Sequence, residues 1–170
     1  GTTSAFTTVR TITYDIEVPT GAVTVPSAFM NAGQTQITGT AFDVLSEVSI
    51  LEVALSSDVA GGDGSWYNGV GFTADLGDSG VWRSTDSWTD QGAGLIDWQW
   101  TRPALDQGKV YSVVLRITDN AGNVKTQTLA ERRTFLYDEV DPLVTLLDPN
   151  TEFERSLPTI SGGSSDGASN

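Results

Sequence analysis

Acidic side chains gather at two turns of the chain. Asp138, Glu139 and Asp141 stand together in a short segment that ends in a proline, and Asp119 stands in a turn beside Asn120. Ca²⁺ takes about six to eight oxygen ligands, mostly from carboxylates and carbonyls. These four acids are therefore candidate Ca²⁺ ligands. The alternative is that they are solvated linker and turn residues, because the chain has no EF-hand or nonapeptide calcium pattern.

Aromatic rings form the second candidate site. All five tryptophans lie between residues 66 and 100. Flat apolar rings can stack on sugars, but inward-facing rings also fill the space between two sheets. Trp98 and Trp100 alternate on one face of an apolar run, which favours a place in the core. Trp88 stands in a polar segment, so Trp88, Trp66 and Tyr67 are the candidate ligand contacts.

The residue types in the sequence give little support for catalytic activity. The chain has no histidine and no cysteine, which removes the commonest general base, thiolate nucleophiles and the usual zinc ligands. Paired carboxylates are unavoidable among 22 acids, so their presence carries little weight. We therefore expect no enzyme activity, no catalytic residues and no required cofactor, with Ca²⁺ as the one candidate ion.

The charge balance excludes some partners. The formal net charge is −13, and such a surface repels nucleic-acid phosphates and anionic membranes. No apolar run reaches 18 residues, so no membrane insertion is expected. A soluble extracellular location suits this composition.

The hydrophobic pattern predicts β-strands throughout. Short runs rich in Val, Ile, Thr and aromatics alternate with Gly, Asp, Ser and Asn clusters. In residues 48–56 the apolar face changes phase near Ile50, which predicts a β-bulge there. The main predicted strands span 22–26, 35–42, 48–56, 95–101, 109–118 and 124–137, with short ones near 65–67, 71–75 and 80–84.

The chain also repeats itself. When residues 124–170 are placed on 1–47 without a gap, eleven positions are identical, including Tyr14 with Tyr137 and Asp15 with Asp138. A fixed internal period indicates a tandem array. We predict three parts: residues 1–15 are the last strand of a preceding repeat, 16–138 are a complete module with a Gly- and Trp-rich insertion at 57–94, and 139–170 are the first strands of the next repeat.

The chain resembles bacterial immunoglobulin-like and fibronectin III-like tandem repeats of large surface proteins and adhesins. Leu105, six residues before Tyr111, is similar to the tyrosine-corner pattern of those domains, and residues 111–123 resemble their F–G hairpin. The segments around Asp15 and Asp138 resemble their inter-repeat linkers. The resemblance implies an all-β, antiparallel Ig-like β-sandwich with about seven strands per repeat.

These observations lead to two functional hypotheses. The first is a structural module of a secreted or cell-surface protein, such as an adhesin stalk, a spacer or a filament subunit. Its partners would be neighbouring repeats or copies of the same protein, joined within one chain or head-to-tail by strand complementation. The alternative is a module that binds a surface glycan or another ligand through exposed aromatics of the 57–94 insertion.

Overall fold

The computed structural model describes residues 11–148, 155–156 and 159–167. These residues form strands, turns and irregular segments and contain no helix, which confirms the predicted all-β class. A search of the described residues for a helix able to cross a membrane found none. Residues 11–19 form no strand, and residues 1–10 of the predicted terminal strand lie outside the described part of the chain.

Four antiparallel strands form the first sheet. Its order is β1-β3-β9-β8, so strands far apart in the sequence lie side by side. The strands are β1 (Thr20–Val25), β3 (Gln36–Phe42), β9 (Leu95–Thr101) and β8 (Ser87–Gly92).

The second sheet is larger and of mixed direction. Its main path is β2-β12-β10-β4-β5-β6, and β2 pairs with β12 in parallel. Two short strands pair from outside this path, β11 with β10 and β7 with β4. The strands are β2 (Phe29–Met30), β4 (Val48–Ser56), β5 (Trp66–Tyr67), β6 (Phe72–Ala74), β7 (Arg83–Ser84), β10 (Val110–Asp119), β11 (Val124–Thr126) and β12 (Arg133–Tyr137).

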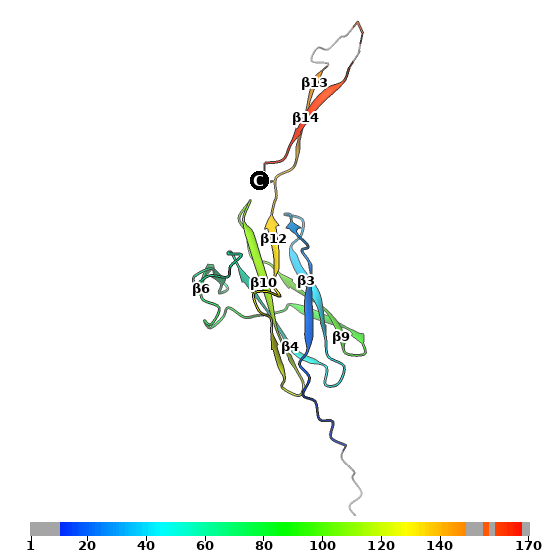
Figure 1. Cartoon of the computed structure of the whole chain (residues 1–170), viewed down its shortest axis with the longest axis vertical. Helices are drawn as coiled ribbons and strands as arrows, with labels where there is room; N and C mark the ends of the chain where they lie inside the picture. Colours follow the sequence, from blue (N-terminus) through cyan, green and yellow to red (C-terminus); the bar gives the residue numbers. More distant parts are fainter. Residues whose placement is uncertain (1–10, 149–154, 157–158, 168–170) are drawn as a thin grey trace, which may run out of the picture.

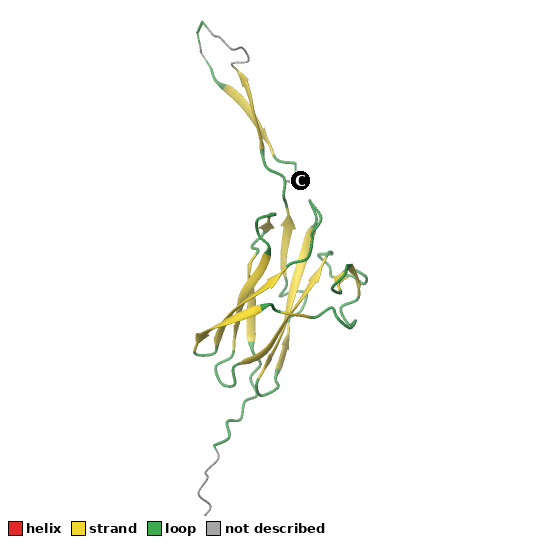
Figure 2. Ribbon diagram, turned by 180° about the vertical axis from the view of Figure 1, so that it is seen from behind, coloured by secondary structure: helices red, strands yellow, loops and turns green. Residues whose placement is uncertain are grey.

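The two sheets lie face to face as a β-sandwich (Figure 2), and the larger of two hydrophobic cores lies between their inner faces. Ile37 and Trp98 come from the first sheet, and Val53 and Leu115 from the second; all are at most 2% exposed. The burial follows the alternation of strand residues, because successive side chains point to opposite faces. Gly39 makes room for the indole, since a Cβ there would stand 2.5 Å from Cζ2 of Trp98.

A second, smaller core lies on the outer face of the larger sheet. Ala54 of β4 and Val114 of β10 point outward and are covered by Trp66, Ala74 and Val81. Residues between β4 and β8 therefore fold back over the sheet and give it an apolar cover. Trp66 is anchored further by its indole N–H, which donates to the carbonyl of Gly61 at 3.1 Å.

The predicted strand positions agree with the structure at most places. The bulge expected near Ile50 is present, because the pairing moves from Thr118 opposite Ile50 to Asp119 opposite Val48. The single strand predicted over 124–137 divides into β11 and β12. Gln127 lies between them and uses its side chain to bond the backbone of Leu115 and of Gly21.

Part of the segment predicted as an insertion, 57–94, belongs to the first sheet. Residues 87–92 form β8, the edge strand of the first sheet, in which Trp88 stands directly opposite Trp98. This segment is polar and exposed along its whole length, so it lacks the alternating pattern that identifies a half-buried strand.

Beyond the sandwich, β13 (Leu143–Asp148) and β14 (Ser161–Ser165) pair as a separate hairpin (Figure 1). Its register reproduces that of β1 and β3 once 123 is subtracted from each number. Leu143 opposite Ser165 matches Thr20 opposite Phe42, and all five aligned pairs agree. The register shift falls at the same place in both ladders. The two pairs of strands therefore have the same construction.

Candidate metal centre

Three aspartates from separate parts of the chain meet at the end of the sandwich where residues 11–19, called the linker below, lead into β1. Asp15 belongs to the linker before β1, Asp43 follows β3, and Asp119 is the last residue of β10. One carboxylate oxygen from each lies within 4.8 Å of the other two. All three residues are buried, with exposed fractions of 8%, 5% and 2%.

The loop after β3 is organised around the carboxylate of Asp43. Its Oδ1 accepts hydrogen bonds from the backbone N–H groups of Leu45, Ser46 and Glu47 at 2.8–3.1 Å. Gly94 permits this arrangement from the neighbouring turn. Its φ is +81°, and a Cβ there would overlap the carbonyl of Asp43. Asp43 is therefore fixed in position before any ligand binds.

The turn after β10 holds Asp119 in a similar way. Asn123 donates to it twice, from its backbone N–H at 2.8 Å and from its side-chain amide at 2.9 Å. Burial acts to raise the pKa of Asp119, but hydrogen bonds from Asn123, Gly122 and Ser46 outweigh it, so the pKa lies below the ordinary value. Asp119 is thus held as a carboxylate.

Asp15 connects the linker to this turn. Its Oδ1 accepts the backbone N–H of Glu17 at 3.0 Å, and its main-chain carbonyl accepts the side-chain amide of Asn123 at 3.2 Å. Its Oδ2 is buried and has no hydrogen-bond partner among the described residues. A buried carboxylate oxygen without a partner is costly in free energy, so this atom requires an explanation.

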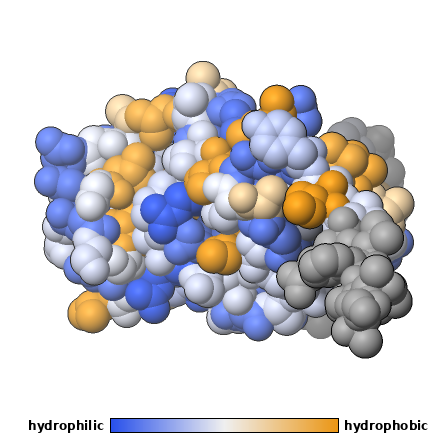
Figure 3. All heavy atoms as spheres, turned by 90° about the horizontal axis from the view of Figure 1, so that it is seen from below, coloured by the Kyte–Doolittle hydropathy of each residue, from blue (hydrophilic) through white to orange (hydrophobic). Residues whose placement is uncertain are grey.

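The chemistry of the donor set is that of a hard cation. All three groups are carboxylates, and like charges at this separation disfavour one another unless a positive charge stands between them. Seen from the linker end, polar and apolar side chains intermingle over the surface around the entry (Figure 3). Two of the three carboxylates, those of Asp43 and Asp119, are therefore already held in position by hydrogen bonds.

The four acids predicted from the sequence do not form one site. Asp119 belongs to the three-aspartate cluster, whereas Asp138, Glu139 and Asp141 stand beyond the opposite end of β10, whose ten residues span about 30 Å. The reason is topological: β10 begins beside the end of β12 and runs away from it. Strand pairing thus separates the two turns that the sequence analysis considered together.

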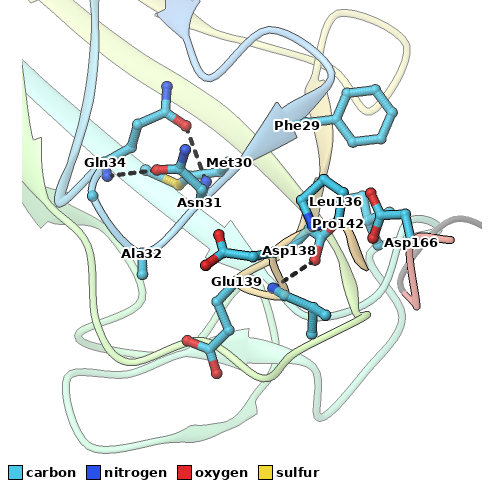
Figure 4. Close-up of a pocket in the computed structure, with 13 residues that line it drawn as sticks. Phe29, Met30, Asn31, Ala32, Gln34, Leu136, Asp138, Glu139, Pro142 and Asp166 are labelled. Atoms are coloured by element: carbon cyan, nitrogen blue, oxygen red, sulfur yellow. Dashed lines mark hydrogen bonds between the residues drawn. The ribbon is translucent and has the colours of Figure 1, made fainter. Parts of the chain in front are cut away.

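Residues 138–142, which join β12 to the hairpin and are called the second junction below, line a pocket between the sandwich and the hairpin (Figure 4). Gln107 makes two hydrogen bonds to this junction. Its amide nitrogen donates to Asp138 at 2.9 Å, and its amide oxygen accepts the N–H of Glu139 at 2.6 Å. The carboxylate of Glu139 instead accepts the hydroxyl of Tyr137. Asp141 and Asp166 also line the pocket, and Glu139 points away from Asp166.

The predicted aromatic contacts differ in how accessible they are. Trp66 is fully buried in the second core, so its ring has no face open to a sugar. Tyr67 is partly buried and packs against the rings of Phe72 and Trp100. Trp88 is 42% exposed, and Trp98 and Trp100 are in the core as predicted.

Asp15 and Asp43 are the site residues that the sequence analysis missed. A signal for both was present, since each is identical across the 123-residue period, to Asp138 and Asp166 respectively. What the sequence did not show is that the linker and two distant loops converge. No protein-family model matches this chain, and no curated protein matches it either.

Proposed function

We infer that this chain is a structural module of an extended tandem array of Ig-like sandwiches. The observation that carries the inference is the common register of the β1–β3 and β13–β14 ladders at a spacing of 123 residues, including the position of the shift. Two unrelated hairpins are not expected to share five aligned residue pairs and the position of one register shift. The simplest source is a second copy of the same module that begins at the second junction.

The strand order supports the Ig-like part of the proposal. Sandwiches of this class place strands one, two, five and four of the chain in one sheet and the remainder in the other. The first sheet here has that pattern if the two-residue strand β2 and the short strands of the 57–86 segment are set aside. The hydroxyl of Tyr111, at the start of β10, accepts the backbone N–H of Asp106 at 2.8 Å, which is the bond expected of a tyrosine corner.

Exposed apolar residues at both ends support the array. Ile12 is 87% exposed, whereas its counterpart Phe135 is 1% exposed in the core of the complete module. Leu146 is 62% exposed, whereas its counterpart Val23 is 4% exposed. Each end thus displays residues that a full module buries, as expected of partial neighbours in an array.

The role that follows is mechanical rather than catalytic. The linker leaves one end of the sandwich and the hairpin leaves the other (Figure 1), so repeated modules would add length rather than bulk. An adhesin stalk, a spacer or a filament subunit at the cell surface has this requirement. The net charge of −13 would keep neighbouring rods apart in solution.

A tandem variant tests the proposal. Residues 139–170 are replaced by a second copy of 16–138, which would complete the second module. Pulling on single molecules should then give two equal unfolding events, each releasing roughly 400 Å of chain, from about 3.4 Å for each of the 123 residues of the period. The 170-residue chain should give one such event. A single event, or two unequal ones, in the tandem variant would reject the array.

Head-to-tail strand exchange between copies stays a prediction within this proposal. Removal of residues 1–15 should leave a monomer if exchange joins the copies. Size-exclusion chromatography with light scattering would show this, and polymers that persist after the deletion would exclude exchange.

One observation favours glycan binding as a second candidate function. Trp88 borders a groove on the outer face of the first sheet, and the other residues there are mainly hydroxyl, amide and acid side chains. Sugars are bound by this combination of an aromatic ring and polar groups. The lining residues include Thr24, Thr38, Thr40, Ser87, Thr89, Asp97 and Gln99.

A glycan array separates this candidate from the structural role. Binding that is lost in Trp88→Ala but kept in Trp82→Ala, which removes a half-buried ring elsewhere, would support the groove. The absence of binding to every glycan on the array would leave the structural function alone.

A further inference from the structure

We propose that β8, the outer strand of the first sheet, pairs in antiparallel direction with β8 of a second copy of this chain. The two first sheets would then join into one across a two-fold axis. The proposal goes beyond the structural role, because this pairing requires neither a tandem array nor an exchanged terminal strand.

β8 is the edge of the sandwich best able to add a strand. It pairs with β9 on one side only, and all six of its residues are exposed. Side chains of the larger sheet occupy the opposite edge, where Gln127 donates to the carbonyl of Gly21 at 3.0 Å. Arg133 likewise donates to the carbonyl of Val23 at 3.1 Å. The end strands of the larger sheet, β2 and β6, have only two and three residues.

The residues of β8 do not protect this edge. Natural edge strands avoid pairing through lysines, prolines, bulges or a covering segment. β8 reads Ser-Trp-Thr-Asp-Gln-Gly, without Lys, Arg or Pro, and its one charged side chain is that of Asp90. Its pairing with β9 is regular from Ser87 to Asp90, and the register shifts only between Asp90 and Gly92. Most of the strand therefore presents a regular edge.

The hydrogen bonds of β9 show which groups of β8 point away from the sheet. Gln99 directs its carbonyl toward β8, because this oxygen accepts the N–H of Asp86 at 2.9 Å. Opposite residues of an antiparallel ladder alternate between hydrogen-bonded and non-hydrogen-bonded pairs. Ser87, which stands opposite Gln99, is therefore bonded to β9, and so is Thr89, two positions further along.

The backbone groups of Trp88 and Asp90 consequently point outward. When Trp88 stands opposite Asp90 of the second copy, both residues exchange their N–H···O=C bonds on either side of an axis at Thr89. The neighbouring registers place Asp90 opposite Asp86 or opposite Asp90 of the other copy. Like charges directly opposite destabilise a ladder. The charges of β8 thus select one register and make the strand complementary to itself.

A cleft beside β8 adds apolar contact to the ladder. Its volume is about 500 Å³, and Trp88 lines it together with Ile50 and Leu51 of β4. Trp88 is 42% exposed and Ile50 is 49% exposed. A strand added along β8 would bring its side chains next to this cleft and remove apolar surface from water.

The contact should be weak and should strengthen with salt. A pair of six-residue strands is small beside stable interfaces, which bury about 1,200–2,000 Å². Each copy also carries a net charge of −13, and the repulsion between copies is screened as the ionic strength rises. Dimers should therefore form at high chain concentration and dissociate as the salt is lowered.

The test is sedimentation equilibrium of the 170-residue chain at up to about 1 mM in about 150 mM NaCl. Wild type should show a reversible monomer–dimer equilibrium. Thr89→Lys should raise the dissociation constant about fivefold or more, because it sets two lysines against each other at the axis. Thr89 is exposed, so the variant should fold normally, and a thermal unfolding scan would verify it.

Thr40→Lys is the matched control. Thr40 and Thr89 both stand opposite Asp97, one on each side of it, so the two variants share the new charge and the acidic neighbour. Thr40 lies on β3, inside the sheet, and its change should leave the dissociation constant within about twofold. Equal weakening in both variants would show that net charge controls the association, which would overturn the assignment to β8.

Hydrogen exchange at single amides gives an independent readout. The N–H groups of Trp88 and Asp90 should exchange more slowly as the dimer forms. Those of Ser87 and Thr89 are already bonded to β9 and should not change. A wild type that stays monomeric would overturn the proposal, and so would a dimer in which the exchange of Trp88 and Asp90 is unaffected.

The same measurements recognise two other occupants. Dimers that are lost on removal of residues 1–15 would show strand exchange instead of β8 pairing. Slower exchange at Trp88 that requires an added glycan would show a sugar site at this edge. None of these results depends on the unfolding of the tandem variant, so failure of β8 pairing and failure of the array can be told apart.

Discussion

Arg116 and Glu52 face each other across β10 and β4 and form a two-point ion pair. Nε of Arg116 donates to one carboxylate oxygen of Glu52 at 2.6 Å, and Nη2 donates to the other at 2.9 Å. The guanidinium also lies over the ring of Trp82, 4.6 Å from its centroid. The pair thus joins the two central strands of the larger sheet to the segment that covers them.

We expect Arg116→Lys to destabilise the protein by about 1 kcal/mol. A lysine ammonium keeps the charge, but it cannot make two parallel hydrogen bonds to one carboxylate or lie flat on the tryptophan ring. Urea unfolding followed by fluorescence would measure the loss. Lys125→Arg is the control, since Lys125 makes a single bond to the exposed Glu131 at 2.7 Å. Equal stability of Arg116→Lys and wild type would show that the fork geometry contributes nothing.

Trp66→Ala should cost about 3–5 kcal/mol of unfolding free energy, the usual penalty for removing a large buried side chain. The ring is fully buried and fills the second core. Trp88→Ala should cost under about 1 kcal/mol, because that ring is 42% exposed. Paired denaturant titrations would measure both. Similar losses in the two variants would contradict the assignment of Trp66 to the core.

Tyr111→Phe should destabilise the protein by about 1 kcal/mol, because the backbone N–H of Asp106 would lose its acceptor. Burial raises the pKa of the Tyr111 hydroxyl above its ordinary value, so the group stays protonated at physiological pH. Tyr67→Phe is the control, since no hydrogen bond to that hydroxyl occurs within the described residues. Thermal unfolding would rank the two, and a neutral Tyr111→Phe would argue against a tyrosine corner.

We expect the free energy of unfolding to depend on pH below pH 5 through the ionisation of Glu131. Hydrogen bonds from Lys125 and from Thr128 lower its pKa from 4.5 to about 2. A carboxylate whose pKa falls on folding stabilises the protein above its unfolded pKa, and this contribution disappears as the pH falls from about 4.5 to about 2. The difference in stability between wild type and Glu131→Gln should therefore shrink across that window.

Urea titrations at several pH values would record this difference. Ser79→Ala, a change at an exposed residue that does not titrate, is the control and should give a difference that is nearly constant with pH. A constant difference for Glu131→Gln would show that the hydrogen bonds around Glu131 do not stabilise its ionised form.

The sequence predicted the strands of the sandwich well where one face is buried. β4 and β9 have the predicted bounds, because their alternation reports a core on one side. β8 was missed because an edge strand exposed on both faces carries no such pattern. Trp66 was misjudged for a related reason, since the second core is built by a polar, glycine-rich segment that folds back onto the sheet.

The candidate site was predicted only in part, and the reason is distance along the chain. Asp119 was identified from its turn, but its partners lie 76 and 104 residues earlier, from the numbers 43 and 15. Local composition does not report such convergence. The repeat alignment marked both partners as identical positions, yet identity across a period is equally expected of residues that only shape a turn.

The second core makes the two flanks of the module unequal. Residues between β4 and β8 cover the outer face of the larger sheet, whereas side chains on the outer face of the smaller one, such as those of Thr24 and Asp97, are exposed. A partner that approaches the smaller sheet would meet the side chains of its strands directly, whereas a partner that approaches the larger sheet would meet the covering segment. The two faces of the sandwich are therefore chemically unequal.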